Sequence, residues 1–144
     1  SAAIWTVLGL ASDLYYRKFT RQLDFTGSTQ LSIAHTHALA LGTTIMLVVL
    51  ALVRTFGLAS DRRFRFFPMF WDAGLALTFG SLVVKGTAQV LALDWATSKA
   101  LAGVSGLGHM VLAGSFVLLM LVVLRAAKRA PEASAALAEQ GATR

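Results

Sequence analysis

Residues 31–53 read LSIAHTHALALGTTIMLVVLALV, and this stretch decides the fold class. It holds no Asp, Glu, Lys or Arg, and at about 20 residues it is long enough to cross the hydrocarbon core of a bilayer. Lipid satisfies no backbone hydrogen bonds, so a spanning run of this kind must be helical. Similar apolar runs follow at residues 68–93 and 101–124, and a shorter one precedes them at residues 2–16. We therefore expect an all-α membrane protein, a four-helix transmembrane bundle with up-down-up-down topology.

The composition agrees with a membrane protein. Hydrophobic residues make up 56% of the 144 residues, and charged residues only 14%, against about 25% in a typical soluble domain. The four spans place residues 1–129 in one transmembrane unit. Residues 130–144 contain Ala, Glu and Gly without an apolar face, so we predict a solvated C-terminal tail.

The charge pattern excludes several function classes. The net charge is +6, but the basic residues lie mainly between the apolar runs, so no soluble basic surface for nucleic acid is expected. The chain has no cysteine, which excludes disulfides, zinc–thiolate sites and a thiol nucleophile. No glycine-rich phosphate loop and no Ser–His–Asp arrangement is evident. The sequence does not decide whether the protein is an enzyme.

The distribution of Lys and Arg predicts the orientation. Seven flank the spans at residues 54–65 and 125–129, against four at residues 17–21 and 99 on the other side. Because cytoplasmic loops carry an excess of Lys and Arg, both termini are expected inside. We therefore predict a multi-pass membrane protein with both termini in the cytoplasm.

Ionisable side chains within the spans are the strongest functional signal. Such groups are expensive in lipid and by default face the bundle interior or a cavity. Because the helix directions alternate, the ionisable residues of all four spans lie toward the same membrane face. This holds whether that face is inside or outside. These residues are Asp13, His35, His37, Lys85 and His109, together with Gln89.

Histidines on facing helices at similar depth predict a cofactor site. His35 and His37 are two residues apart, so on a regular helix they point to nearly opposite sides, and they cannot both ligate one ion. We expect His35 and His109 to be the axial ligands of a b-type haem. His37 is then a supporting group or an interface contact, which allows a homodimer.

Small and basic residues near these histidines fit a large flat cofactor. Gly42 and Gly106 would leave room for a porphyrin, while Lys85 and Arg17 would pair with its propionates. The expected activity is electron transfer, or the handling of haem or a diatomic gas, with a respiratory or other electron-transfer partner.

Other functions remain open. Instead of haem iron at His35 and His109, a transition-metal site for Zn or Cu would use histidine together with Asp13 and Gln89, because imidazole suits these ions. His37 and Asp13 are the alternative metal ligands. A non-enzymatic accessory or interaction subunit would use its polar residues for helix–helix recognition. A transporter is disfavoured because four spans show no inverted repeat.

Several motifs along residues 5–125 resemble an uncharacterised bacterial family of small four-span membrane proteins, domain of unknown function 2871. The family more usually has Arg where this chain has Lys85. The resemblance implies the four-span fold and a place in the bacterial inner membrane, but no activity. The motifs are Tyr16-Arg17, Phe19-Thr20, Phe25-Thr26-Gly27, Leu31-Ser32, His35-Thr36-His37, Leu41-Gly42, Lys85-Gly86 with Gln89, Ser105-Gly106 and Gly108-His109.

Residues Ala34 and His35 also bear a faint similarity to the core subunit of haem–copper oxidases and nitric oxide reductases. There, a histidine near the start of the second span is an axial ligand of the low-spin haem, which implies this role for His35. The likeness is a fold-level analogy, and the chain is too short for the two-centre catalytic core of those enzymes.

Overall fold

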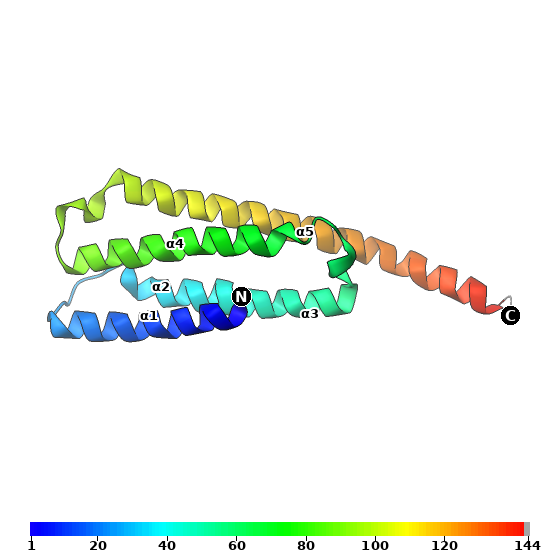
Figure 1. The fold of residues 1–144 in the computed structure, drawn as a ribbon, viewed down its shortest axis with the longest axis horizontal. Helices are drawn as coiled ribbons and strands as arrows, with labels where there is room; N and C mark the ends of the chain where they lie inside the picture. The colour runs from blue at the N-terminus through cyan, green and yellow to red at the C-terminus, as the bar shows by residue number, and fades with distance from the viewer. Residues whose placement is uncertain (143–144) are drawn as a thin grey trace.

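The computed structural model describes residues 1–142 and the side chains of residues 1–129. It consists of four long helical rods joined by short connections (Figure 1). No strand occurs within residues 1–142, so the all-α prediction is confirmed. The rods are α1 (Ala2–Gln22), a continuous rod of α2 (Leu31–His37), η1 (Ala38–Ile45) and α3 (Met46–Phe56), then α4 (Phe66–Val90) and α5 (Lys99–Ala142), with the 3-10 turns η2 (Leu58–Ser60) and η3 (Asp94–Thr97).

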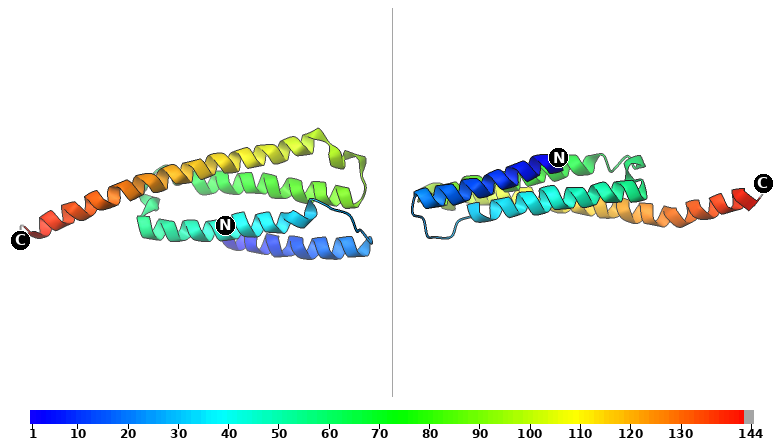
Figure 2. Two further views of the ribbon diagram at one scale, coloured as in Figure 1. Left: turned by 180° about the vertical axis from the view of Figure 1, so that it is seen from behind. Right: turned by 90° about the horizontal axis from the view of Figure 1, so that it is seen from below.

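The rods run lengthwise side by side, and the chain reverses direction at each connection (Figures 1 and 2). α1 packs against α2 and η1, α2 packs against α4, and α4 packs along α5. The histidine-bearing helix α2 therefore lies between α1 on one side and the α4–α5 pair on the other.

Three helical segments in the described part of the chain are long and apolar enough to cross a membrane. They are Leu31–Phe56 with 26 residues, Phe66–Val90 with 25, and Lys99–Arg129 with 31. α1 has 21 residues but is not among them, because its second half carries Asp13, Arg17, Lys18 and Arg21. It also extends past the run predicted at residues 2–16.

The predicted tail, residues 130–144, lies outside the residues whose side chains the structure describes. α5 continues as a helix through Ala142, and residues 143–144 lie outside the described chain.

Glycines allow the rods to approach closely. A Cβ on Gly86 would collide with the backbone of Leu31, and a Cβ on Gly42 would collide with the indole of Trp5. Between α4 and α5, a Cβ on Gly108 would lie 2.5 Å from Thr78 Oγ1. These contacts bring helices together through small residues, as is common in lipid.

A π-helix, η1, begins directly after His37. The π-helical backbone bonds five residues apart, which is rare and concentrates at functional sites. Two tryptophans pack on this segment. Trp5 of α1 fills the space over Gly42, and Trp71 of α4 donates its Nε1 hydrogen to the carbonyl oxygen of Leu41 at 3.1 Å.

Candidate functional site: a histidine pair beside an apolar groove

The imidazole rings of His37 and His109 face one another between α2 and α5. Their centroids lie 6.0 Å apart, and the two ring planes are inclined by 82°. His37 is half-buried at the end of α2, whereas His109 is exposed on α5. Both helices begin at the same end of the molecule, so the two histidines lie at comparable depth (Figure 1).

Each ring is oriented by a carbonyl one helical turn earlier. His37 Nδ1 lies 3.1 Å from the carbonyl oxygen of Ile33, and His109 Nδ1 lies 2.8 Å from that of Ser105. A carbonyl oxygen only accepts, so Nδ1 carries the proton in both rings. In the neutral imidazoles Nε2 then holds a free lone pair, which is the usual state of a metal-binding histidine.

An apolar groove of about 440 Å³ runs beside the histidine pair. His109 forms part of its wall, η1 forms another part, and Trp71 lines it from α4. Its volume lies within the ~300–1,000 Å³ typical of small-molecule sites, which are mostly apolar with a few polar groups. The apolar lining residues are Leu41, Ile45, Trp71, Leu112, Ala113, Phe116 and Val117.

The sequence led us to expect His35 opposite His109, and the structure instead pairs His37 with His109. His35 points toward α1, where its Nδ1 lies 3.9 Å from Asp13 Oδ1, and its Nε2 lies 3.3 Å from Thr36 Oγ1. The two histidines occupy opposite sides of α2, as their spacing required. Because α2 lies between α1 and α5, only one of them can reach α5.

The two cations expected near a propionate lie in different surroundings. Arg17 Nε donates a hydrogen bond of 2.9 Å to Asp13 Oδ2 within α1, and its side chain is 72% exposed. Lys85 is half-buried in α4. One turn later, Gln89 Oε1 accepts a hydrogen bond of 2.8 Å from the backbone N–H of Gln30. Arg17 thus belongs to the Asp13 side of α2, away from His37.

The two glycines expected to leave room for a porphyrin have different roles. The space over Gly42 is filled by Trp5, so this glycine serves helix packing. A Cβ on Gly106 would meet no atom within 4 Å, so this position on α5 is open.

A metal cage built from protein ligands alone finds little support. Within the described residues, no group of three or more His, Cys, Asp or Glu side chains is placed to hold an ion. Zinc sites need three or four protein ligands. The Asp13–His35 contact supplies two, and so does the His37–His109 pair. A haem needs only two axial ligands from the protein, because the porphyrin supplies the others.

Two features of the site had no signal in the sequence. The π-helix depends on how η1 packs between Trp5 and Trp71, which the apolar pattern does not reveal. From its place near a span end, Trp71 is expected to lie at the membrane–water interface. In the structure it is buried, at 3% exposure, and it lines the groove.

A protein-family model described as "Protein of unknown function (DUF2871)" matches residues 1–126. This match confirms the family resemblance of the motifs. No curated protein and no solved structure matches the chain, so the similarity to haem–copper oxidase core subunits stays a prediction.

Proposed function

Because the chain belongs to the DUF2871 family, which carries no assigned function, we propose from the geometry of this site that it is a membrane protein that binds b-type haem through His37 and His109. One observation carries the proposal: two imidazoles, each with Nδ1 bonded to a carbonyl, lie with ring centroids 6.0 Å apart. At a metal–imidazole distance of about 2 Å, two rings on opposite sides of one ion have centres about 6 Å apart.

The surroundings of the pair suit a porphyrin. The groove beside His109 is apolar and carries the aromatic side chains of Trp71 and Phe116. Burial in such surroundings and hydrogen bonds to the axial imidazoles tune the reduction potential of haem iron. Lys85 is the remaining candidate partner for a propionate, because Arg17 is bound to Asp13.

Electron transfer is the activity we favour. His37 and His109 would both be used to hold the haem, and a haem held by two histidines would supply electron transfer. His37 and His109 would hold and orient the haem, and the groove would exclude water. The haem would exchange electrons with a respiratory or other redox partner.

We propose that the four rods form an up-down-up-down bundle in the bacterial inner membrane. α1 would lie at membrane depth because it packs along α2 and η1, and the apolar side chains of Ile4, Val7 and Leu10 point outward. The excess of Lys and Arg at residues 54–65 and 125–129 would place that end, and both termini, in the cytoplasm.

A second candidate is an accessory subunit that recognises another helix. The observation that favours it is the open surface of α5, where a Cβ added at Gly103, Gly106 or Gly114 would meet no atom within 4 Å. Small residues on a lipid-facing surface let a partner helix approach closely, and a homodimer is one such arrangement.

The absorption spectrum of the detergent-purified protein tests the proposal. After expression with ample haem, we expect a sharp Soret band and, on dithionite reduction, resolved α and β bands of six-coordinate haem. A spectrum without absorbance beyond the protein band would overturn haem binding. Metal analysis of the same sample would then separate an ion site from an accessory subunit.

A further inference from the structure

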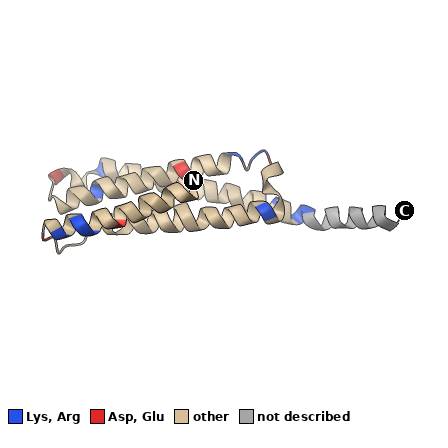
Figure 3. Ribbon diagram, turned by 60° about the horizontal axis from the view of Figure 1, so that its bottom comes forward, with Lys and Arg blue, Asp and Glu red and all other residues tan. Residues whose placement is uncertain are grey.

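Lys and Arg lie at both ends of the molecule (Figure 3), and the end opposite the histidine pair carries the larger set. Its cations come from the end of α3, from the segment before α4 and from α5, and all of them are exposed. The acidic residue within this end, Asp61, accepts a hydrogen bond of 2.9 Å from the backbone N–H of Arg63. The cations are Arg54, Arg62, Arg63, Arg65, Arg125, Lys128 and Arg129.

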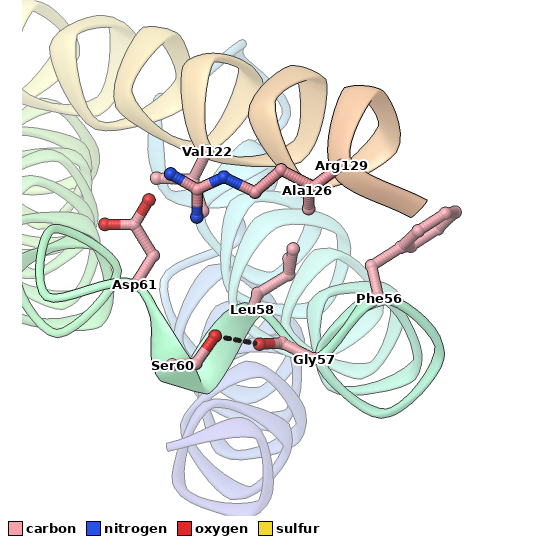
Figure 4. Close-up of a pocket in the computed structure, with 8 residues that line it drawn as sticks. All are labelled: Phe56, Gly57, Leu58, Ser60, Asp61, Val122, Ala126 and Arg129. Atoms are coloured by element: carbon pink, nitrogen blue, oxygen red, sulfur yellow. Dashed lines mark hydrogen bonds between the residues drawn. The ribbon is translucent and has the colours of Figure 1, made fainter. Parts of the chain in front are cut away.

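A small cleft lies between η2 and α5, next to the basic segments. Leu58 is 1% exposed and lines this cleft of about 60 Å³ with Val122 of α5. Figure 4 shows the Arg129 side chain lying across the cleft, with its guanidinium turned toward the Asp61 side. Gly57, at φ +62°, turns the chain out of α3, and Ser60 Oγ donates to its carbonyl oxygen at 2.9 Å. The cleft therefore brings Arg129 of α5 close to Asp61, which directly precedes Arg62 and Arg63 in the sequence.

This surface lies at the ends of all three apolar helices. Residues 57–65 connect the segment ending at Phe56 with the segment beginning at Phe66, and the third apolar segment ends at Arg129. Exposed aromatics accompany the cations: the Arg65 guanidinium carbon lies 4.7 Å from the centre of the Phe66 ring, next to Phe70. Arginines and aromatics beside span ends are typical of the headgroup level of a bilayer.

We infer that this basic end binds the phosphate headgroups of anionic phospholipids, of the phosphatidylglycerol class. The arginine guanidinium presents a planar fork of donors that matches phosphate oxygens, and several cations at headgroup depth add their attraction. The partner is a lipid because the surface continues directly from the apolar helix ends, where lipid headgroups are the neighbouring groups. This inference is independent of haem.

Native mass spectrometry of the full chain in detergent tests the inference. The protein is titrated with phosphatidylglycerol and with phosphatidylcholine of identical acyl chains. The triple variant R62Q/R63Q/R65Q should lose at least about tenfold in phosphatidylglycerol affinity and with it the preference for this lipid. The variant R62K/R63K/R65K keeps the charge but loses the guanidinium fork, so it should keep a preference between those of the unaltered protein and of R62Q/R63Q/R65Q.

A matched control removes three cations from the other end of the molecule. K18Q/R21Q/K99Q makes the same change in net charge and should keep the preference of the unaltered protein. Equal loss in both triple variants, or an unaltered protein that binds the two lipids equally, would overturn the inference. Competition by soluble glycerol phosphate at the same concentration as the lipid would also contradict it, because a free phosphate would then suffice.

Discussion

The indole Nε1 of Trp71 donates a hydrogen bond of 3.1 Å to the carbonyl oxygen of Leu41, which belongs to the π-helix that begins directly after His37. This hydrogen bond joins α4 to the π-helix η1. Trp71 is 3% exposed and also lines the apolar groove beside His109. The same residue therefore supports the backbone near one histidine and shapes the space near the other.

Replacing Trp71 by Phe should destabilise the protein by about 1–3 kcal/mol, because a buried carbonyl loses its donor. Thermal unfolding in detergent, followed by circular dichroism, measures the effect. Trp95→Phe is the control, since Trp95 is 49% exposed and should tolerate the change. Equal effects of the two substitutions would show that the Trp71–Leu41 bond contributes nothing specific.

The three histidines should differ in their effect on haem content. His37→Ala and His109→Ala each remove one side of the pair, so we expect loss or strong weakening of the haem absorbance. His35→Ala should retain a six-coordinate spectrum, because His35 faces Asp13 of α1. Haem per protein in the purified variants measures this difference. Retention in H37A together with loss in H35A would reverse the assignment of the two residues.

Gly86→Ala should destabilise the protein by about 1–3 kcal/mol, because the added methyl group would meet the backbone of Leu31 and force α2 away from α4. Gly103→Ala is the matched control. A Cβ there meets no atom within 4 Å, and alanine favours a helix by about 1 kcal/mol over glycine. Thermal unfolding of both variants under one detergent condition compares them. A neutral Gly86→Ala would contradict the close approach of α2 and α4.

Trp5 and Asp72 should be energetically coupled. Trp5 Nε1 donates a hydrogen bond of 2.8 Å to Asp72 Oδ1, which joins α1 to α4. In a double-mutant cycle of Trp5→Phe and Asp72→Ala, we expect a coupling free energy of about 0.5–3 kcal/mol. Unfolding free energies of the four proteins provide the measurement. Strict additivity would mean that this contact does not hold α1 in place.

The sequence was sufficient to predict the all-α class. It was also sufficient to predict that the helices of residues 31–53 and 101–124 bring histidines to similar depth. Long runs without charge can only be helices in lipid, and residues 31–53 and 101–124 begin at the same end when the rods alternate. Histidines near the start of both runs were therefore expected at similar depth, and the ring centroids of His37 and His109 do lie 6.0 Å apart.

The choice between His35 and His37 was beyond the sequence. Helical periodicity establishes that they lie on opposite sides of α2, but the rotation of α2 depends on contacts made by other residues. Gly86 packs against Leu31 and Gly42 against Trp5, and neither contact can be read from spacing. The span expected at residues 2–16 depended in the same way on how far charged residues extend into α1.

The π-helix η1 changes the directions in which the side chains before and after it point. Within Ala38–Ile45 each turn takes up more residues than an α-helical turn does, so the side chains on its two sides are offset from α-helical phase. Removal of one residue there would let the segment relax to an α-helix while His37 keeps roughly its direction relative to α3, because the π-helical turn has already taken up the extra residue. A single-residue deletion in η1 should therefore be tolerated better than the same deletion in α3, where it would rotate the preceding part of the rod by about 100°.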